Sequence, residues 1–351
     1  MITNPKVTVL LPCYNAEVYL CEAVDSILNQ TYQNLEILLI DDGSSDRTKE
    51  MILDYASKDL RVVPVFNERN LGLIRTLNKG VLMATGDYIA RMDADDISAL
   101  NRIERIVSEF LLHPEFDIIS ASYYRIAASG KMLGKNYPKA TISKALQFVS
   151  FFCTPVIHPC MVAKTKVLSE NLFDENYLHS EDYEIFSRLL SAGSGFLNLS
   201  EPLYYLRMNT QSVSFKFEKI QISTHTKISA RNIENYFNVK YDFFLHKVMI
   251  NRISFNVSPS LLKKAISSLK DLKIKFIERE QPSKEVVDEM NEFLNEQFID
   301  IYFQSFKMAN WYNKPFMMLM ILANLDIFIS NRGWQYFRTK LAFLPTRKEK
   351  I

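Results

Sequence analysis

The sequence contains neither of the two glycine-rich patterns that commonly cradle a phosphate group. No G-x-G-x-x-G follows the first predicted strand, and no G-x-x-x-x-G-K-[ST] occurs anywhere in the 351 residues. These patterns are typical of dinucleotide-dependent oxidoreductases and P-loop nucleotidases, so the sequence supports neither class. A phosphate-binding site in this chain would have to be built in another way.

Paired cysteines and long apolar runs are also missing. The four cysteines (Cys13, Cys21, Cys153 and Cys160) have no C-x-x-C or zinc-binding spacing, and the start of the chain does not resemble a secretory signal. We therefore expect reduced thiols in a cytoplasmic protein. No apolar run reaches the roughly 18 residues of a membrane-spanning helix. The closest run, 315–329, is interrupted by Asn324 and Asp326.

Charge is nearly balanced overall but uneven along the chain. The formal net charge is +2, which is too small to indicate a nucleic-acid partner. Residues 314–351 hold seven Lys/Arg and two Asp/Glu, a net +5, so the rest of the chain carries −3. The hydrophobic content of 48% indicates an ordered globular protein.

The first 120 residues alternate short apolar runs with amphipathic segments. Predicted strands cover 7–11, 35–40, 61–66, 87–92 and 116–120, and predicted helices cover 17–30, 45–57, 71–85 and 99–113. This alternation predicts an α/β fold with a mostly parallel sheet flanked by helices. Further on we expect a helix from Ser180, a strand at 202–208, and a helical region from 216 with breaks at Pro259 and Pro282.

Carboxylates follow two of the predicted strands. Asp41 and Asp42 come after the second, and Asp93, Asp95 and Asp96 come after the fourth. Both groups should meet at the same edge of the sheet, where α/β proteins bind ligands. Clustered carboxylates repel one another, and a divalent ion such as Mg²⁺ or Mn²⁺, completed by substrate phosphates, would offset that repulsion.

A simpler interpretation of the second group is a helix cap. Asp96 or Ser98 would then cap a helix that begins near Ala99. This explains one acid and leaves the others unexplained. A calcium loop is excluded, because Ile97 and Ser98 stand where a ligand and the required glycine should be.

Six motifs in this order resemble the family 2 inverting glycosyltransferases, which have the GT-A fold. They begin with "VTVLLPCYNAEVYLCEAVDSILNQTYQNLEILLIDDGSSDRT", "NLGLIRTLNKG" and "GDYIARMDADDIS", and continue with "IHPCMV", "SEDYEIFSRLL" and "EPLYYLRMNTQSVS". The resemblance covers about residues 5–215. It implies a glycosyltransferase domain over 1–215, with a nucleotide-binding half to about 115 and an acceptor half over about 116–215, followed by a helical region over 216–351.

The resemblance also implies roles for individual residues. Those expected to bind the nucleotide are Pro12, Tyr14, Asp41, Asp42, Gly72, Arg75 and Asp93. Among them, Asp42 would accept a hydrogen bond from the base, Asp41 would support the loop, and Arg75 would lie near the nucleotide. Asp95, together with Asp93, would bind the Mn²⁺ or Mg²⁺ ion that bridges the diphosphate.

The catalytic base implied by the resemblance is Asp182, with Glu181 beside it. Taken alone, Asp182 could equally be the residue that caps the following helix. The resemblance further implies that Glu181, His158 and Arg207 would contact the acceptor or a phosphate, with a metal contact as a further alternative for His158. Taken alone, a histidine is more often a core or loop residue. The family commonly has histidine where this chain has Asn209.

The sequence after residue 314 mixes an apolar run, aromatic residues and basic residues. This combination suits peripheral contact with the cytosolic face of a membrane through 315–351. A core helix with a solvated basic end explains it equally well.

The reading that accounts for all of these features is a metal-dependent inverting glycosyltransferase. It would transfer sugar from a nucleotide sugar, expected to be UDP-linked, to a glycan or lipid-linked acceptor in surface polysaccharide synthesis, with no role for nucleic acid. The alternatives are a catalytically silent nucleotide-sugar binding or assembly module and a sugar nucleotidyltransferase. The latter needs a glycine-rich phosphate loop early in the chain, which this sequence does not have.

Overall fold

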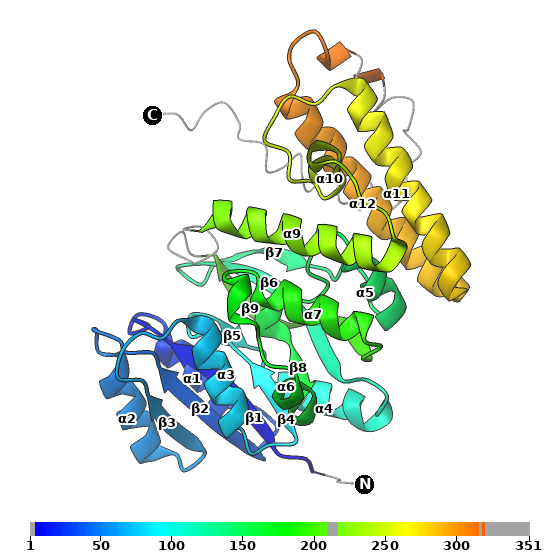
Figure 1. Cartoon of the computed structure of the whole chain (residues 1–351). Coiled ribbons are helices and arrows are strands. Elements are labelled where there is room, and N and C mark those ends of the chain that lie inside the picture. Colours follow the sequence, from blue (N-terminus) through cyan, green and yellow to red (C-terminus); the bar gives the residue numbers. More distant parts are fainter. Residues whose placement is uncertain (1–3, 209–216, 316–317, 320–351) are drawn as a thin grey trace. The chain divides into compact units, whose positions relative to one another are not determined.

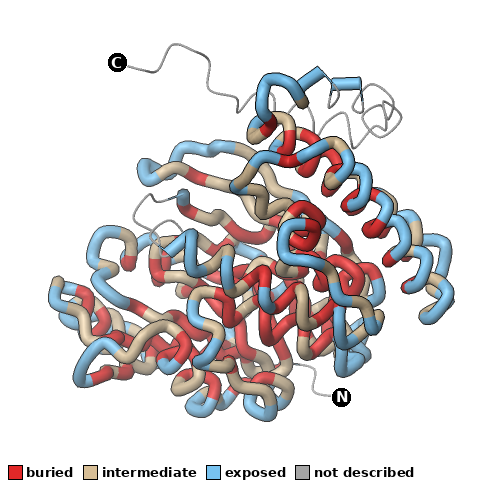
Figure 2. Tube along the Cα trace, turned by 45° about the horizontal axis from the view of Figure 1, so that its top comes forward, coloured by how far each residue is buried: buried red, intermediate tan, exposed pale blue. Residues whose placement is uncertain are grey.

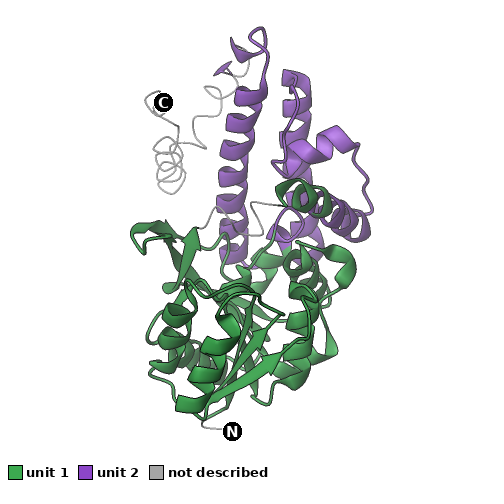
Figure 3. Ribbon diagram, turned by 90° about the vertical axis from the view of Figure 1, so that its left-hand side faces the viewer, with its two compact units in different colours: residues 1–147, 154–224 green, residues 148–153, 225–351 purple. Residues whose placement is uncertain are grey.

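The computed structural model describes residues 4–208, 217–315 and 318–319. The chain divides into two compact units (Figure 3). The first unit holds residues 1–147 and 154–224, and the second holds 148–153 and 225–351. The boundary expected at 215 falls outside the described residues. The segment 148–153 belongs to the second unit, although it lies between two segments of the first. The sequence-based division, which follows chain order, did not predict this.

A single nine-stranded sheet forms the centre of the first unit (Figure 1). Its order is β3 (Val62–Phe66), β2 (Leu35–Asp41), β1 (Val7–Cys13), β4 (Tyr88–Arg91), β8 (Val162–Lys164), β6 (Ile118–Ala127), β9 (Phe196–Met208) and β5 (Ile97–Ser98), with β7 (Met132–Asn136) paired to β6. The first four strands are parallel, as the alternation predicts. β8 runs antiparallel to both of its neighbours, and β6 and β9 are again parallel.

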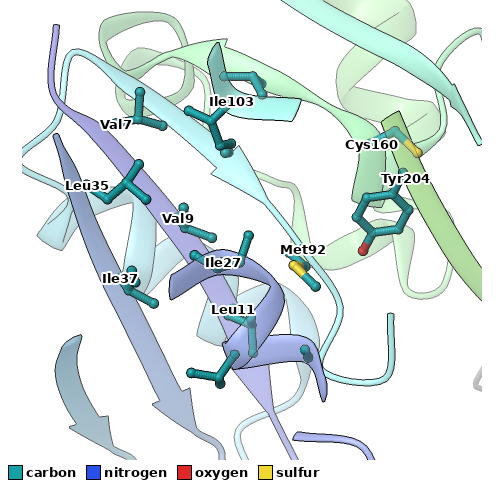
Figure 4. Packing of buried hydrophobic residues seen from close by; sticks show 14 of the residues in the cluster. Val7, Val9, Leu11, Ile27, Leu35, Ile37, Met92, Ile103, Cys160 and Tyr204 are labelled. Atoms are coloured by element: carbon teal, nitrogen blue, oxygen red, sulfur yellow. The ribbon is translucent and has the colours of Figure 1, made fainter. Parts of the chain in front are cut away.

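Helices cover both faces of the parallel half of the sheet. They are α1 (Leu20–Leu28), α2 (Thr48–Lys58), α3 (Leu73–Met83) and α4 (Arg102–Leu112). This cover explains why the strand sequences are apolar at nearly every position. On one face, Val7, Val9 and Leu11 of β1 pack in one buried cluster with Leu35 and Ile37 of β2, Ile27 of α1 and Ile103 of α4 (Figure 4).

The opposite face of the sheet receives α3. A Cβ atom at Gly80 of this helix would lie 2.1 Å from a methyl carbon of Leu10 and 2.8 Å from one of Ile40. Glycine therefore lets α3 lie close against β1 and β2. This packing fixes the position of the loop before α3, which borders the carboxyl edge of the sheet.

The remaining described helices of the first unit follow β7. They are α5 (Ser143–Val149), which ends in the second unit, α6 (Thr165–Glu170) and α7 (Glu181–Ser191), with short 3₁₀ turns at His158–Cys160 and Glu175–Tyr177. α7 begins within one residue of the predicted start at Ser180. Its first turn carries the "SED" motif.

The second unit is helical, as the sequence predicts. It contains most of α9 (Glu218–Phe237), and all of α10 (Phe243–Met249), α11 (Pro259–Glu280) and α12 (Lys284–Met308). The side chains of Asp242, Ser258 and Ser283 each cap a helix by accepting a backbone N–H. Pro259 begins α11 and Pro282 lies between α11 and α12, so both mark the predicted breaks.

None of the helices in the described ranges is both long and apolar enough to cross a membrane. The predicted membrane contact at 315–351 lies almost entirely outside the described residues, which include only 315, 318 and 319 of this stretch.

Phenylalanine side chains form the core of the second unit. The ring of Phe148 lies 5.3–6.4 Å from the rings of Phe151, Phe152, Phe276 and Phe293. Phe148, Phe276 and Phe293 are almost fully buried. The segment 148–153 is therefore part of this core.

We expect Phe148→Ala to lower the free energy of unfolding by about 3–5 kcal/mol, because it leaves a cavity among these rings. The matched control is Phe243→Ala, whose side chain is 60% exposed and whose loss should cost less than about 0.5 kcal/mol. Urea denaturation of both variants measures the difference. Equal losses would contradict this description of the core.

Candidate active site

The loops after β1 and β2 are tied together at the carboxyl edge of the sheet. The backbone N–H of Asn15 donates to Ser44 Oγ at 2.9 Å, and the N–H of Ser45 donates to Asn15 Oδ1 at 2.9 Å. Asn15 takes a left-handed conformation, with φ of +49°. Of the two residues predicted to line the nucleotide pocket here, Tyr14 is 53% exposed and Pro12 is half-buried.

Asp41 and Gly43 shape the turn after β2. Asp41 Oδ1 accepts the backbone N–H of Ser44 at 3.1 Å, which is a loop-supporting contact. Gly43 has φ of +72°, and a Cβ there would lie 2.5 Å from the carbonyl carbon of Arg69. Only glycine allows the segment around Arg69 to approach this turn so closely.

Asp42 is buried and holds the segment that leads into α3. Its Oδ1 accepts hydrogen bonds from Asn67 Nδ2 and from the backbone N–H of Leu71, both at 2.8 Å. Its Oδ2 accepts the N–H of Gly72 at 2.9 Å. Each carboxylate oxygen can accept two hydrogen bonds, so within the described chain only Oδ2 has a position left for a ligand. The sequence did not reveal these loop partners.

Gly72 and Arg75 lie at the start of α3. Gly72 has φ of +88°, and no atom lies within 4 Å of the position a Cβ would take, so this side of the loop is open. Arg75 Nε donates to Glu175 Oε2 at 2.7 Å, and both side chains are more than half exposed. Salt bridges between exposed side chains contribute little to stability, so this ion pair leaves Arg75 able to exchange partners.

Arg91, the last residue of β4, is a buried cation that the sequence analysis missed. Its Nη1 lies 2.7 Å from Asp93 Oδ2 and its Nη2 lies 2.5 Å from Asp93 Oδ1, which makes a bidentate ion pair. The Arg91 side chain is only 4% exposed. Burial opposes its charge, but Asp93, Tyr204 and Asp96 together outweigh burial and raise the pKa of the guanidinium.

The carboxylates after β4 form a tight cluster. One oxygen from each of Asp93, Asp95 and Asp96 lies within 4.8 Å of the others. Burial and the charge of Asp93 raise the pKa of Asp95 to about 6, and burial with the charges of Asp93 and Asp95 raises that of Asp96 well above its ordinary value. A divalent cation with oxygen ligands fits this group, because it would offset the repulsion that raises these pKa values.

The carboxylate of Asp96 is held by hydrogen bonds from two other residues. Among the described residues, no such bond from another residue is found for the carboxylate of Asp95. The Asp96 carboxylate accepts the backbone N–H of Arg207 at 2.7 Å and a hydrogen bond from Tyr204. The helix that follows begins at Arg102 with Asn101 at its N-cap position, so neither Asp96 nor Ser98 caps it. The capping interpretation of this motif is therefore wrong, whereas the expected metal ligation by Asp93 and Asp95 stays a prediction.

Arg207 anchors the acidic loop instead of facing it with free donors. Its Nε donates to the carbonyl oxygen of Asp95 at 2.7 Å, its Nη2 to Glu22 Oε2 at 2.6 Å, and its Nη1 to the carbonyl oxygen of Ala128 at 3.0 Å. The guanidinium also lies 4.4 Å from the ring centre of Tyr19. Every nitrogen of the group has a protein partner, and the phosphate or acceptor contact expected from the sequence stays a prediction. Asn209, the departure from the family pattern, lies outside the described residues.

A second buried arginine, Arg102, is hydrogen-bonded to the end of β4, immediately before the acidic loop. Arg102 is fully buried, and its Nη2 donates to the carbonyl oxygens of Arg91 at 2.9 Å and Pro159 at 3.1 Å. Its guanidinium lies 4.9 Å from the ring centre of Tyr204, whose hydroxyl oxygen accepts the N–H of Asp93 at 3.2 Å. Burial lowers the pKa of Arg102. Arg102 therefore links β4 to the turn at 158–160.

The "SED" carboxylates come to the same region from α7. Ser180 occupies the N-cap position, so Asp182 is the second residue of the helix and not its cap. Asp182 Oδ1 accepts the N–H of Tyr183 at 2.7 Å, while burial raises the pKa of its carboxyl group. Burial and the charge of Asp182 raise the pKa of Glu181 to about 7. The charge of Arg91 acts on both carboxylates, and the charge of Asp93 also acts on Glu181.

His158 lies in a largely apolar environment near these groups. It is 6% exposed, and its ring lies 5.2 Å from the ring of Phe173 and 5.9 Å from that of Phe186. Burial and the charge of Arg91 hold the pKa of His158 well below its ordinary value, so the imidazole is neutral. Its Nε2 has no hydrogen-bond partner among the described residues, which leaves one buried polar atom for a ligand.

Comparison with known proteins identifies the class and the family. Residues 8–175 match the sequence model of glycosyl transferase family 2. An uncharacterized glycosyltransferase of Haemophilus influenzae is 34% identical over 244 residues, in an alignment that covers 67% of this chain and 75% of the relative.

Two solved structures resemble this one at low sequence identity. S. aureus TarS 1–349 in complex with UDP-GlcNAc has a TM-score of 0.54 and 16% identity, with 95% of this chain and 92% of that one covered. The mannosyltransferase PcManGT from Pyrobaculum calidifontis, in complex with GDP-Man and Mn²⁺, has a TM-score of 0.50 and 16% identity, with 87% and 88% covered.

At such identities these likenesses show the fold, which is the GT-A fold of glycosyltransferases. Together with the sequence matches, they establish that the chain belongs to glycosyltransferase family 2 and is a transferase enzyme.

We expect Arg91→Met to lower the free energy of unfolding by about 1–3 kcal/mol, because it leaves the half-buried Asp93 beside other carboxylates without its cation. Arg75→Met is the matched control, since it breaks an exposed ion pair and should cost about 0–1 kcal/mol. Thermal unfolding at neutral pH compares the two. A loss for Arg91→Met no larger than that of the control would show that Arg91 does not balance the cluster.

Proposed function

We propose that this enzyme transfers a sugar from a UDP-sugar to a hydroxyl group with inversion at the anomeric carbon. The observation that supports it most is electrostatic. The charge of one buried cation, Arg91, acts on the carboxylate after β4 at Asp95 and on those at the start of α7, Glu181 and Asp182. Inverting transfer needs these two sets of groups near each other: one to hold the leaving diphosphate and one to activate the acceptor.

The donor nucleotide is proposed to bind at the loops after β1 and β2. The remaining acceptor position on Asp42 Oδ2 suits the imide N–H of uracil. Tyr14 and Pro12 would border the base, and the open side of Gly72 would admit the nucleotide close to the backbone. Arg75 would leave its exposed partner Glu175 and contact the donor nucleotide instead. The TarS complex with UDP-GlcNAc supports a uridine nucleotide, while the GDP-Man complex makes guanosine the alternative to test.

Asp95 and Asp93 are proposed to hold Mn²⁺ or Mg²⁺. When bound, such an ion neutralises the charge that develops on the departing diphosphate. The Mn²⁺ in the PcManGT complex supports a divalent ion in a related fold. The remaining residues act on the loop: Arg91 orients the Asp93 carboxylate, and Arg207 and Tyr204 fix Asp96.

Asp182 is proposed as the base that accepts the proton of the acceptor hydroxyl. Its Oδ1 is held by the N–H of Tyr183, which fixes the direction of the carboxylate. A single displacement by this hydroxyl, without a covalent intermediate, inverts the anomeric configuration. Glu181, with its raised pKa, and the free Nε2 of neutral His158 are proposed to contact the acceptor or a phosphate.

The acceptor is proposed to be a glycan or a lipid-linked glycan in surface polysaccharide synthesis, in the cytoplasm. This part rests on resemblance to the family alone. Pockets for the acceptor are built from variable loops, so the residues named above do not select it.

We expect Asp95→Ala to abolish the Mn²⁺-dependent part of UDP binding, because one of two metal-binding carboxylates is lost. The matched control is Asp54→Ala on α2, where an exposed carboxylate pairs with Lys58 and with no other cation of the described residues. Calorimetric titration with UDP, with and without Mn²⁺, compares them. Unchanged Mn²⁺ dependence in Asp95→Ala would reject this metal site.

We expect Asp182→Asn to bind UDP as the wild type does. The rate at which it forms UDP from a UDP-sugar should fall roughly 10²–10⁴-fold, since the general base is lost. Asp174→Asn is the control, because its carboxylate only accepts the N–H and side-chain amide of Asn176. UDP release would be followed with water and with glycan acceptors across a panel of UDP-sugars. Turnover of Asp182→Asn at the wild-type rate would exclude Asp182 as the base.

A further inference from the structure

Aromatic side chains, four of them exposed and one half-buried, gather at one end of the second unit. Phe243 and Phe244 begin α10, Phe255 lies in the loop between α10 and α11, and Trp311 and Tyr312 follow α12. We call these five residues the aromatic end. Phe243, Phe244, Trp311 and Tyr312 are 54–71% exposed, and Figure 2 shows the exposed character of this part of the chain. Solvent exposure of so many large rings in one place needs an explanation.

Contacts between the segments make the aromatic end a built surface. The ring of Phe244 lies 5.0 Å from that of Phe255. The next residue, Asn256, accepts the backbone N–H of Asn310 at 3.0 Å, immediately before Trp311. The rings of Trp311 and Tyr312 lie 3.8 Å apart. Segments more than 50 residues apart in sequence are thus held together.

The charge around the aromatic end is positive, while the charge of the preceding helix is negative. Residues 240–258 and 306–315 together carry five Lys/Arg and one Asp, a net +4. Lys247 lies 5.1 Å from the ring of Phe243, and Lys314 lies 5.6 Å from that of Phe306. Residues 284–303 of α12 carry six Asp/Glu and one Lys, a net −5. The charge therefore reverses along α12 toward the aromatic end.

We propose that the aromatic end binds the surface of a bilayer that contains anionic lipid. Trp, Tyr and Phe insert into the headgroup region of a membrane, and neighbouring lysines attract anionic headgroups. The acidic part of α12 would be repelled by the same surface, which orients the unit. The sequence beyond residue 319 continues the trend, with six Lys/Arg and two Asp/Glu over 320–351.

A second copy of the chain is a less suitable partner for this surface. In a two-fold dimer the same patch meets itself, so two surfaces of net +4 would face each other. An anionic bilayer instead satisfies both the rings and the cations. This membrane contact goes beyond the proposed sugar transfer, because nothing in donor binding or proton transfer requires it.

The test is co-sedimentation of the full chain with vesicles. We expect binding to phosphatidylcholine vesicles that contain phosphatidylglycerol, little binding to phosphatidylcholine alone, and weaker binding at raised salt. Lys307→Gln combined with Lys314→Gln should weaken binding about 30-fold, given roughly fivefold per cation. Trp311→Ser combined with Tyr312→Ser should weaken it by at least about tenfold. Ile274→Ser, which removes a half-exposed apolar side chain from α11, is the matched control and should bind as the wild type does.

Three results would overturn the proposal: equal binding to vesicles with and without anionic lipid, wild-type binding by the Trp311/Tyr312 double variant, or a stable dimer in solution that this double variant dissociates. Binding of UDP is measured on the same samples and should be unchanged in every variant. Failure of membrane binding is thereby distinguished from failure of the proposed transferase site.

Discussion

The ion pair between the buried Arg91 and the half-buried Asp93 is the interaction on which the candidate site depends. A guanidinium at the end of a buried strand would be unstable without an anion, and the carboxylates after that strand would repel one another without a cation. The guanidinium and the carboxylates therefore stabilise each other. The same positive charge acts on Asp182, which comes from a helix about 90 residues further along the chain. The charge of one residue thus acts on two motifs, although burial still raises the pKa values of their carboxyl groups.

The rest of the site is held in place by contacts within the protein. Asp42 secures the segment before α3, and Arg207 secures the acidic loop from β9. Arg102 joins β4 to the turn that contains His158. A site fixed in this way presents its remaining oxygens and nitrogens in set directions before a substrate arrives. Such preorganisation is what electrostatic catalysis requires.

Much of the fold could be predicted from local pattern. The parallel strands and their helices follow from apolar periodicity, and the breaks at Pro259 and Pro282 follow from the backbone chemistry of proline. The antiparallel β8 and the transfer of 148–153 to the second unit could not be predicted in this way, since both depend on which distant segments pack together.

The same distinction holds for the site. The clustering of Asp93, Asp95 and Asp96 follows from their place after a strand, and the motif order brings in Asp182. Burial of Arg91 and Arg102 is a tertiary property, although a charged residue inside the apolar run "YIARM" was a signal that it needed a partner. The second role of Asp42, and the role of Arg207 in holding the acidic loop, became visible only with their partners in place.

The most direct test of this account is a crystal structure of the protein with UDP and Mn²⁺. We expect the ion to be ligated by Asp95 and by the diphosphate, the uracil to lie against Asp42 Oδ2, and the Arg91–Asp93 pair to remain intact. An ion bound away from Asp93 and Asp95, or a nucleotide bound away from the carboxyl edge of β1 and β2, would contradict it.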